Sequence, residues 1–235
     1  MLTSFSTDSV AVVIGATGGI GAAVLAQLQA NSPFTQVIGL SRSTQPALDL
    51  LGEASIQACA QHISSLELPV RLVLDATGAL HGHGMQPEKS WQQLDPFQMA
   101  QAFAINAIGP ALLMKHFLPL LPKSGKAVFA SLSAKVGSIG DNRLGGWYSY
   151  RASKAALNQL VHTAAIELRR RAPDTVCVVL HPGTVATTLS SPFAKTGLEV
   201  QTSTECAARL LAVIDGLAAK DSGGFFNHDG STLPW

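Results

Sequence analysis

Four glycines crowd into one short stretch of this chain, between an apolar run and a helix-forming run. Residues 12–24 read VVIGATGGIGAAV, which places Gly15, Gly18, Gly19 and Gly21 directly after a candidate strand. Glycine loses more conformational freedom on folding than other residues, so the cluster needs a reason. One reason is a tight turn. The other is a backbone that passes close to a phosphate, because a helix N-terminus offers unpaired N–H groups and a positive dipole end. The spacing is GxxxGxG instead of GxGxxG, so the loop alone leaves both explanations open.

Short apolar runs alternate with helical patterns along the rest of the chain. The expected strands are residues 10–14, 37–40, 56–60, 72–76, 127–130 and 176–180, and the clearest helices are 20–30, 97–121, 150–171 and 203–219. Near-continuous apolar strands separated by helices indicate a parallel sheet covered on both faces. We therefore predict an α/β, doubly wound Rossmann-type fold with a mostly parallel sheet of about seven strands. No linker, repeat or charge block divides the chain, so residues 1–235 are expected to form a single domain.

Composition excludes several classes of protein. The net charge is +1, and no basic stripe suggests a nucleic-acid partner. The first residues contain neither a basic region nor a long apolar segment, so we expect a cytoplasmic protein without membrane anchoring. Charged residues make up only 13% of the chain, and a surface with so few charges favours a homodimer or homotetramer. Three scattered cysteines suggest reduced structural residues. His81 and His83 are two residues apart but have no third ligand at matching spacing, so no metal is expected.

The end of the second predicted strand bears on cofactor choice. In VIGLSRS, Ser41 and Arg42 follow the last glycine by about 20 residues, where an acidic side chain binds the NAD ribose or an arginine the NADP 2′-phosphate. No Asp or Glu stands there, and a guanidinium matches a phosphate in bidentate geometry. Arg42 therefore favours NADP(H) over NAD(H); the alternative is a solvated loop arginine.

A second chemical signal is YSYRASK, in which Tyr150 and Lys154 are four residues apart in a helical segment and share a face. Tyrosine has a pKa of about 10 in water, too high for a proton donor and acceptor at neutral pH. A neighbouring lysine cation lowers that pKa by favouring the phenolate. The pair is common by chance, and it gains meaning only beside the glycine loop and the strand pattern.

These motifs together resemble the short-chain dehydrogenase/reductase family across essentially the whole chain. The resemblance rests on the glycine loop, the YxxxK pair, Asn106 in FAINAIGP and the segment HPGTVATT. GSIGDNRLGGWYSYRASKAALN and GGFFNHDGSTLPW are similar to the C-factor-like branch. The resemblance implies an NADP(H)-dependent enzyme that interconverts a small carbonyl compound and an alcohol by hydride transfer.

The resemblance also implies roles for individual residues. Tyr150 would be the acid/base, Lys154 its partner and a ribose ligand, and Asn106 the holder of a water in a proton relay. Asp75 to Gly78 stand where the family has NNAG, so Asp75 replaces an asparagine. The implied cofactor-binding residues are Gly15, Thr17, Gly18, Gly19, Ile20, Gly21, Ser41, Arg42, Asp75, Ala76, Thr77, Gly78, Asn106, Tyr150, Lys154, Pro182, Gly183, Val185 and Thr187.

The catalytic serine is where this chain departs from the family. Family members usually have two adjacent serines after the strand at 127–130, but Leu132 separates Ser131 from Ser133 here. Counting back from Gly137 gives Ala134, and counting forward along the strand gives Leu132. Ser133 lies between the two and is our prediction, with Ser138 in reserve. The disturbed serine also suits an alternative function: an NADP-binding sensor or C-factor-like signalling protein with little turnover.

Overall fold

Among residues 2–82, 84–189 and 200–235, which the computed structural model describes, six strands form one parallel sheet. Its order is β2-β1-β3-β4-β5-β8, with a separate two-stranded sheet of β6 and β7. The strands are β1 (Val10–Ile14), β2 (Gln36–Leu40), β3 (Val70–Asp75), β4 (Ala127–Leu132), β5 (Thr175–His181), β6 (Thr184–Val185), β7 (Val200–Gln201) and β8 (Phe225–Asn227). The α/β fold class is confirmed, with a central sheet of six strands against the expected seven.

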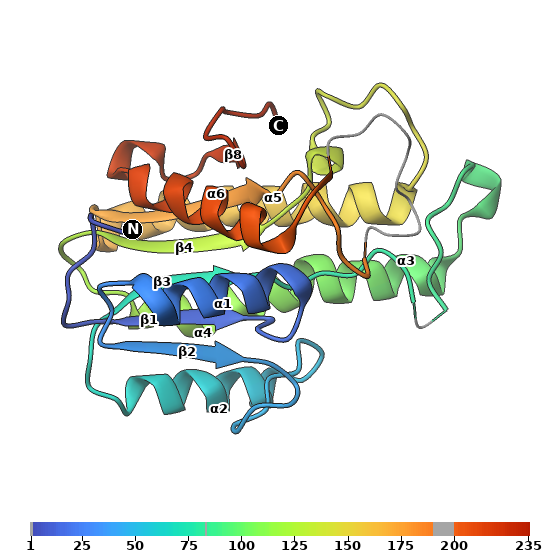
Figure 1. The fold of residues 1–235 in the computed structure, drawn as a ribbon. Helices are drawn as coiled ribbons and strands as arrows, with labels where there is room; N and C mark the ends of the chain where they lie inside the picture. Colours follow the sequence, from blue (N-terminus) through green and yellow to red (C-terminus); the bar gives the residue numbers. More distant parts are fainter. Residues whose placement is uncertain (1, 83, 190–199) are drawn as a thin grey trace.

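Helices cover both faces of the sheet (Figure 1). They are α1 (Gly19–Asn31), α2 (Glu53–Ser64), α3 (Pro96–Phe103), α4 (Gly109–Phe117), α5 (Tyr148–Arg171) and α6 (Ser203–Gly216). Short turns are η1 (Trp91–Gln93), η2 (Ala104–Ile108), η3 (Leu118–Leu120), η4 (Lys135–Gly137) and η6 (Ala219–Asp221). Helices α1 and α6 lie on one face, and α2, α4 and α5 lie on the other. The architecture is therefore three layers, as the alternation of strands and helices predicts.

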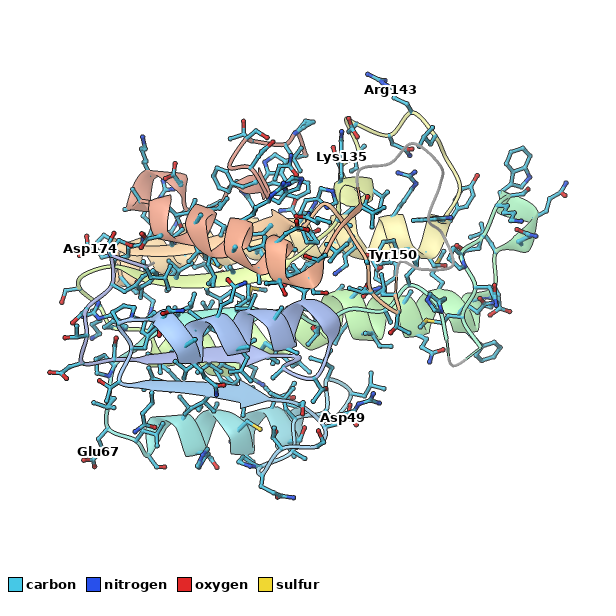
Figure 2. The ribbon with its side chains drawn as sticks, viewed as in Figure 1. Asp49, Glu67, Lys135, Arg143, Tyr150 and Asp174 are labelled. Carbon is cyan, nitrogen blue, oxygen red and sulfur yellow. The ribbon has the colours of Figure 1, made fainter. Side chains whose placement is uncertain are left out.

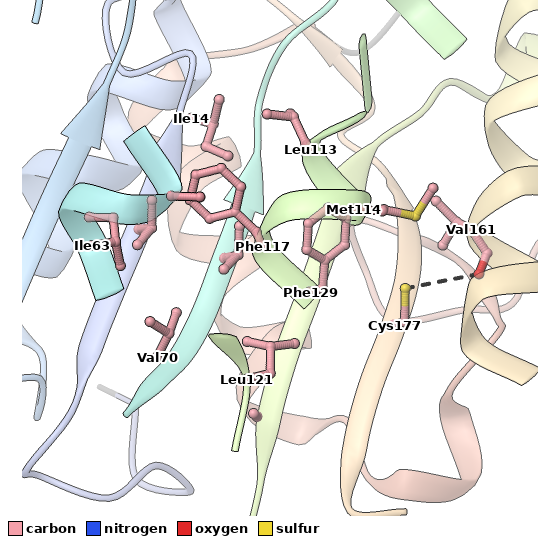
Figure 3. Packing of buried hydrophobic residues seen from close by; sticks show 14 of the residues in the cluster. Ile14, Ile63, Val70, Leu113, Met114, Phe117, Leu121, Phe129, Val161 and Cys177 are labelled. Atoms are coloured by element: carbon pink, nitrogen blue, oxygen red, sulfur yellow. Dashed lines mark hydrogen bonds between the residues drawn. The ribbon is translucent and has the colours of Figure 1, made fainter. Parts of the chain in front are cut away.

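Two buried clusters, one on each face, hold the layers together. On the α4 and α5 side, Phe117 and Phe129 fill the space between helix and sheet, and both are fully buried (Figure 3). The Cys177 thiol lies 3.9 Å from the Val161 carbonyl in the same cluster. All three cysteines are buried and unpaired, as expected. Strands β1 and β5 are buried on both faces, which explains their near-continuous apolar sequence.

The strand order reverses direction at β1, which pairs with β2 on one side and β3 on the other. In open α/β sheets a crevice forms at such a point, outside the carboxyl ends of the strands. The loops after β1, β2 and β3 therefore meet at one edge of the sheet. This edge carries the candidate site.

One predicted strand was wrong: residues 56–60 lie inside α2. The buried side chains are Ile56, Cys59, Ala60 and Ile63, which follow helical spacing, while the residues between them are exposed. The predicted helix at 97–121 is present as α3 and α4, joined by the π turn η2. Strand β8 is three residues long and was not predicted from the sequence.

Within the described residues, one helical stretch, Pro96–Leu120, is long and apolar enough to cross a membrane. Its buried residues Leu113 and Phe117 belong to the core cluster beneath α4. Packing against the sheet accounts for its apolar character, so we interpret it as a core helix.

Candidate active site

The glycine loop after β1 turns so tightly that larger residues do not fit. Gly15 has φ +81°, a conformation that favours glycine, and a Cβ there would lie 3.0 Å from the Ala76 carbonyl oxygen. A Cβ on Gly21 would lie 2.2 Å from the Gly15 carbonyl oxygen. Gly18 is the N-cap of α1 and makes no side-chain cap, and no acidic residue stands in the first turn. The loop thus combines a tight turn with an open helix N-terminus, which suits an anion.

A cavity of about 550 Å³ opens beside this loop. It is lined by eight of the predicted cofactor-binding residues: Gly15, Thr17, Gly18, Ser41, Arg42, Ala76, Thr77 and Gly78. The exposed Arg42 and its neighbour Ser41 line it from the end of β2. Figure 2 shows Asp49, which also lines this cavity, at the same end of the sheet as Tyr150, and Glu67 and Asp174 at the other. The cavity therefore occupies the carboxyl edge of the sheet.

Asp75 ends β3 with a fully buried carboxylate. It accepts hydrogen bonds from Ser131 Oγ at 2.6 Å and from the Thr77 amide at 3.0 Å. Burial raises the pKa of Asp75, while the hydrogen bonds from Ser131 and Thr77 and the charge of Lys154 oppose that rise. The next amide, that of Ala76, donates to the Ile14 carbonyl at 2.9 Å. Asp75 and Ala76 therefore tie the end of β3 to β4 and β1.

Helix α5 places Tyr150 and Lys154 one turn apart, as their spacing predicts. Lys154 is 2% exposed, and its ammonium donates to the Leu132 carbonyl at 2.8 Å. Burial lowers the pKa of Lys154 to about 8, with the charge of Asp75 opposing that fall. Burial raises the pKa of Tyr150 to about 12. Without a ligand, Tyr150 is therefore a neutral phenol across the physiological pH range.

Asn106 lies in the π turn η2 and is fully buried. Its Oδ1 accepts from the Ala79 amide at 2.9 Å, and its Nδ2 donates to the Ala79 carbonyl at 2.8 Å and to Ser153 Oγ at 3.2 Å. A Cβ on Gly78 would lie 3.3 Å from both Asn106 Oδ1 and Lys154 Nζ. The loop after β3, the π turn and α5 therefore converge at Gly78.

The three candidate serines are all buried, and each hydroxyl has a partner. Ser131 donates to Asp75, and Ser133 donates to Asn158 Oδ1 at 2.6 Å. Ser138 Oγ accepts from the Asp141 amide at 3.0 Å. Asn158 lies one turn beyond Lys154 on α5, so Ser133 ties the end of β4 to that helix.

The segment after β5 reaches back to the glycine loop. A Cβ on Gly19 would lie 2.8 Å from Thr187 Cγ2. The Gln201 side chain donates to the Pro182 carbonyl at 2.6 Å, and Val185 is buried in the small sheet. Gly183 follows Pro182 with φ +77°. Ile20, in the first turn of α1, packs against the core cluster on the α6 side.

Several residues at the site were not among the predicted binding residues. His81, Gln101, Ile105 and Leu189 line the large cavity, and His81 Nε2 lies 3.1 Å from the carbonyls of both Thr188 and Leu189. The sequence marks His81 only through its spacing to His83, and Gln101 and Ile105 carry no local signal. No cluster of three potential metal ligands occurs in the part of the chain that the structure describes, and His83 lies outside it.

A glycine-lined cavity at the switch point of a doubly wound parallel sheet is the arrangement of a Rossmann-type fold. The family model described as short chain dehydrogenase matches residues 9–197, and the chain belongs to this family of oxidoreductases.

Curated and solved relatives agree with this assignment. C-signal of Myxococcus xanthus is 37% identical over 142 residues, covering 60% of this chain and 81% of that protein. The 1-hydroxy-2-glutathionyl-2-methyl-3-butene dehydrogenase of Rhodococcus sp. (strain AD45) is 32% identical, and the match covers 97% of this chain and 100% of that protein. Among solved structures, an NADPH-bound carbonyl reductase from chicken fatty liver superposes with a TM-score of 0.83 at 28% identity, covering 98% and 100% of the two chains.

Proposed function

We propose that this protein is an NADP(H)-dependent oxidoreductase that interconverts a carbonyl compound and an alcohol. The proposal rests on the position of Ala79. This residue lines both the large cavity beside the glycine loop and the small cavity that Tyr150 also lines. In this proposal a nucleotide held by the loop ends next to Tyr150, which acts as the proton donor. The NADPH-bound carbonyl reductase among the structural relatives supports the choice of chemistry.

The residues present fit NADP(H). The open N-terminus of α1 and the glycines that tolerate no Cβ suit a pyrophosphate. Arg42 at the end of β2 suits a 2′-phosphate, and Gly78 leaves room beside Lys154 for a ribose. Further contacts are proposed at Ile20, Pro182, Gly183, Val185 and Thr187. NADP(H) would supply the hydride chemistry at this site.

The protein's own contribution is proton transfer and orientation. In the proposed mechanism Tyr150 gives its phenolic proton to the carbonyl oxygen during reduction and takes it back during oxidation. In this proposal the Lys154 cation favours the phenolate of Tyr150 and so acts against burial, which raises the pKa of Tyr150. Asn106 orients a water for the proton relay. Ser133 is the hydroxyl proposed to polarise the substrate oxygen, and for this its proton must leave Asn158 Oδ1.

We also propose an oligomeric state and a cellular location for the protein. The low charge content and the family's general tendency to oligomerise favour a homodimer or homotetramer. We place the protein in the cytoplasm, acting on a small molecule, without nucleic acid or membrane partners. The similarity to C-signal supports a second candidate function, that of an NADP-binding signalling protein with little turnover.

Replacing Tyr150 by phenylalanine tests the proposal. We expect Tyr150→Phe to lower NADPH oxidation with ketones, aldehydes or quinones by about 10²- to 10⁴-fold, because only the proton donor is removed. Binding of NADPH, measured by fluorescence titration, should weaken by no more than about tenfold, because at most one hydrogen bond among many cofactor contacts is lost. Tyr148→Phe is the matched control and should keep wild-type turnover. Wild-type activity in Tyr150→Phe would refute the mechanism. Tight NADPH binding with no turnover on any carbonyl would favour the signalling function.

A further inference from the structure

The helix that carries Tyr150 begins in a conformation that a side chain rarely adopts. Trp147, the N-cap of α5, has φ +52° and ψ 43°, and its own side chain does not cap the helix. Left-handed backbone costs free energy for a bulky residue, so its neighbours must hold it. Tyr150 is the third residue of this helix. Any fraying of the first turn therefore moves the phenol.

Glu88, which is 61 residues earlier in the chain than Ser149, supplies the missing cap. Its backbone carbonyl accepts from the Trp147 amide at 2.5 Å. Its carboxylate accepts from the Ser149 amide at 3.2 and 3.3 Å and also from Ser149 Oγ. Glu88 is only 4% exposed and lines the same small cavity as Tyr150. One residue thus binds the helix start through both its backbone and its side chain.

Further hydrogen bonds hold the segment around Glu88 in place. The Gln86 amide donates to Gln98 Oε1 on α3 at 2.9 Å, and the Lys89 amide donates to Gln93 Oε1 at 2.7 Å. On the other side of Trp147, the Arg151 guanidinium donates to the carbonyls of Gly146 and Gly145 at 2.9 and 3.1 Å. The cap is therefore held between two fixed parts of the fold.

We propose that Glu88 is a positioning residue that fixes the first turn of α5 and thereby aims Tyr150 at the substrate. A carboxylate is well suited to this task, because it accepts two hydrogen bonds at once and lies at the positive end of the helix dipole. The inference rests on the proposed function, in which Tyr150 is the acid/base. It adds a residue from the loop between β3 and η1 whose role is orientation alone.

Two substitutions at Glu88 and one matched control test this role. Glu88→Ala removes both side-chain contacts, and we expect kcat to fall about 10- to 100-fold, since small misplacement of a reacting group has effects of this size. Glu88→Gln retains an acceptor for Ser149 and should keep kcat within about threefold. The KM for NADPH should change little in either variant. Glu205→Ala is the control, because Glu205 binds the amide and hydroxyl of Thr202 at the start of α6 in the same way.

Amide hydrogen exchange gives a readout that does not depend on turnover. We expect the Ser149 amide to exchange about 10- to 100-fold faster in Glu88→Ala, because its charged acceptor is lost. Unchanged kcat and exchange in Glu88→Ala would overturn the proposal, as would a fall in kcat of equal size in Glu205→Ala. If the wild type turns over no carbonyl, the proposed function fails first, and faster exchange confined to the first turn of α5 still supports the cap.

Discussion

Replacing Lys154 by methionine is expected to stabilise the ligand-free protein near neutral pH while abolishing turnover. Lys154 is 2% exposed, and burial lowers its pKa from 10.5 to about 8. In the unfolded chain the same ammonium is solvated and keeps its ordinary pKa. The folded state therefore holds a charge that is better solvated when unfolded. Methionine has a similar length and no charge.

The size of the effect follows from the two pKa values. Because the pKa of Lys154 is lower in the folded protein, the unfolded chain binds more protons between pH 8 and 10.5. The contribution of Lys154 to the free energy of unfolding therefore rises with pH in that window. The difference between 10.5 and about 8, at about 1.4 kcal/mol per unit, makes the charged lysine cost about 3 kcal/mol below pH 8. Loss of its hydrogen bond to the Leu132 carbonyl costs the variant about 1–3 kcal/mol at every pH. The variant should thus gain up to about 2 kcal/mol at pH 7 and be the less stable protein above pH 10.

Urea unfolding of the ligand-free wild type and Lys154→Met at pH 7 and pH 10 measures this directly. The difference in the free energy of unfolding between the two proteins should change by about 2–3 kcal/mol between these pH values. Lys115→Met, at an exposed lysine that pairs with Glu53, controls for the loss of a positive charge. A difference that stays constant from pH 7 to pH 10 would refute the reasoning, because Lys154 would then titrate alike in both states.

Two further predictions concern the cofactor cavity. Arg42→Ala should weaken NADPH binding about 10- to 100-fold, the value of one charge-assisted hydrogen bond, and leave NADH affinity nearly unchanged; equal losses in calorimetric titrations of both cofactors would contradict a phosphate contact. Gly21→Ala should lower stability by about 1–3 kcal/mol and weaken NADPH binding, because the new Cβ meets the Gly15 backbone. Gly216→Ala is its control: a Cβ there meets nothing within 4 Å, and thermal unfolding should show equal or greater stability.

The parts of the site that follow from local sequence were predictable. The glycine loop lies between β1 and α1 because a tight turn between strand and helix has a recognisable composition. Tyr150 and Lys154 share a face of α5 because helical spacing requires it. Arg42 lines the cavity because parallel strands end at a common edge. Each of these inferences needs only the period of one element or the direction of the strands.

The parts that depend on long-range contacts were not predictable. The partner of Ser149 is Glu88, and the partner of Ser133 is Asn158, 25 residues away. No local pattern marks either pair. The error at residues 56–60 has a related cause, because a short run with several small or apolar residues fits a strand or a helix until its packing partners are known.

Asp75 shows how a departure from a family pattern follows from the site's electrostatics. The family's motif has an asparagine there, and this chain has a fully buried carboxylate beside a buried lysine. An ionised Asp75 raises the pKa of Lys154 and so favours the lysine cation. Burial raises the pKa of Asp75 itself, and the hydrogen bonds from Ser131 and Thr77 oppose that rise. An asparagine would accept from Thr77 through its one oxygen, but it would lack the second carboxylate oxygen that accepts from Ser131, and it would leave the lysine charge uncompensated. Each of the two groups, when ionised, favours the charged form of the other, so the aspartate suits the proposed mechanism, in which Lys154 acts as a cation.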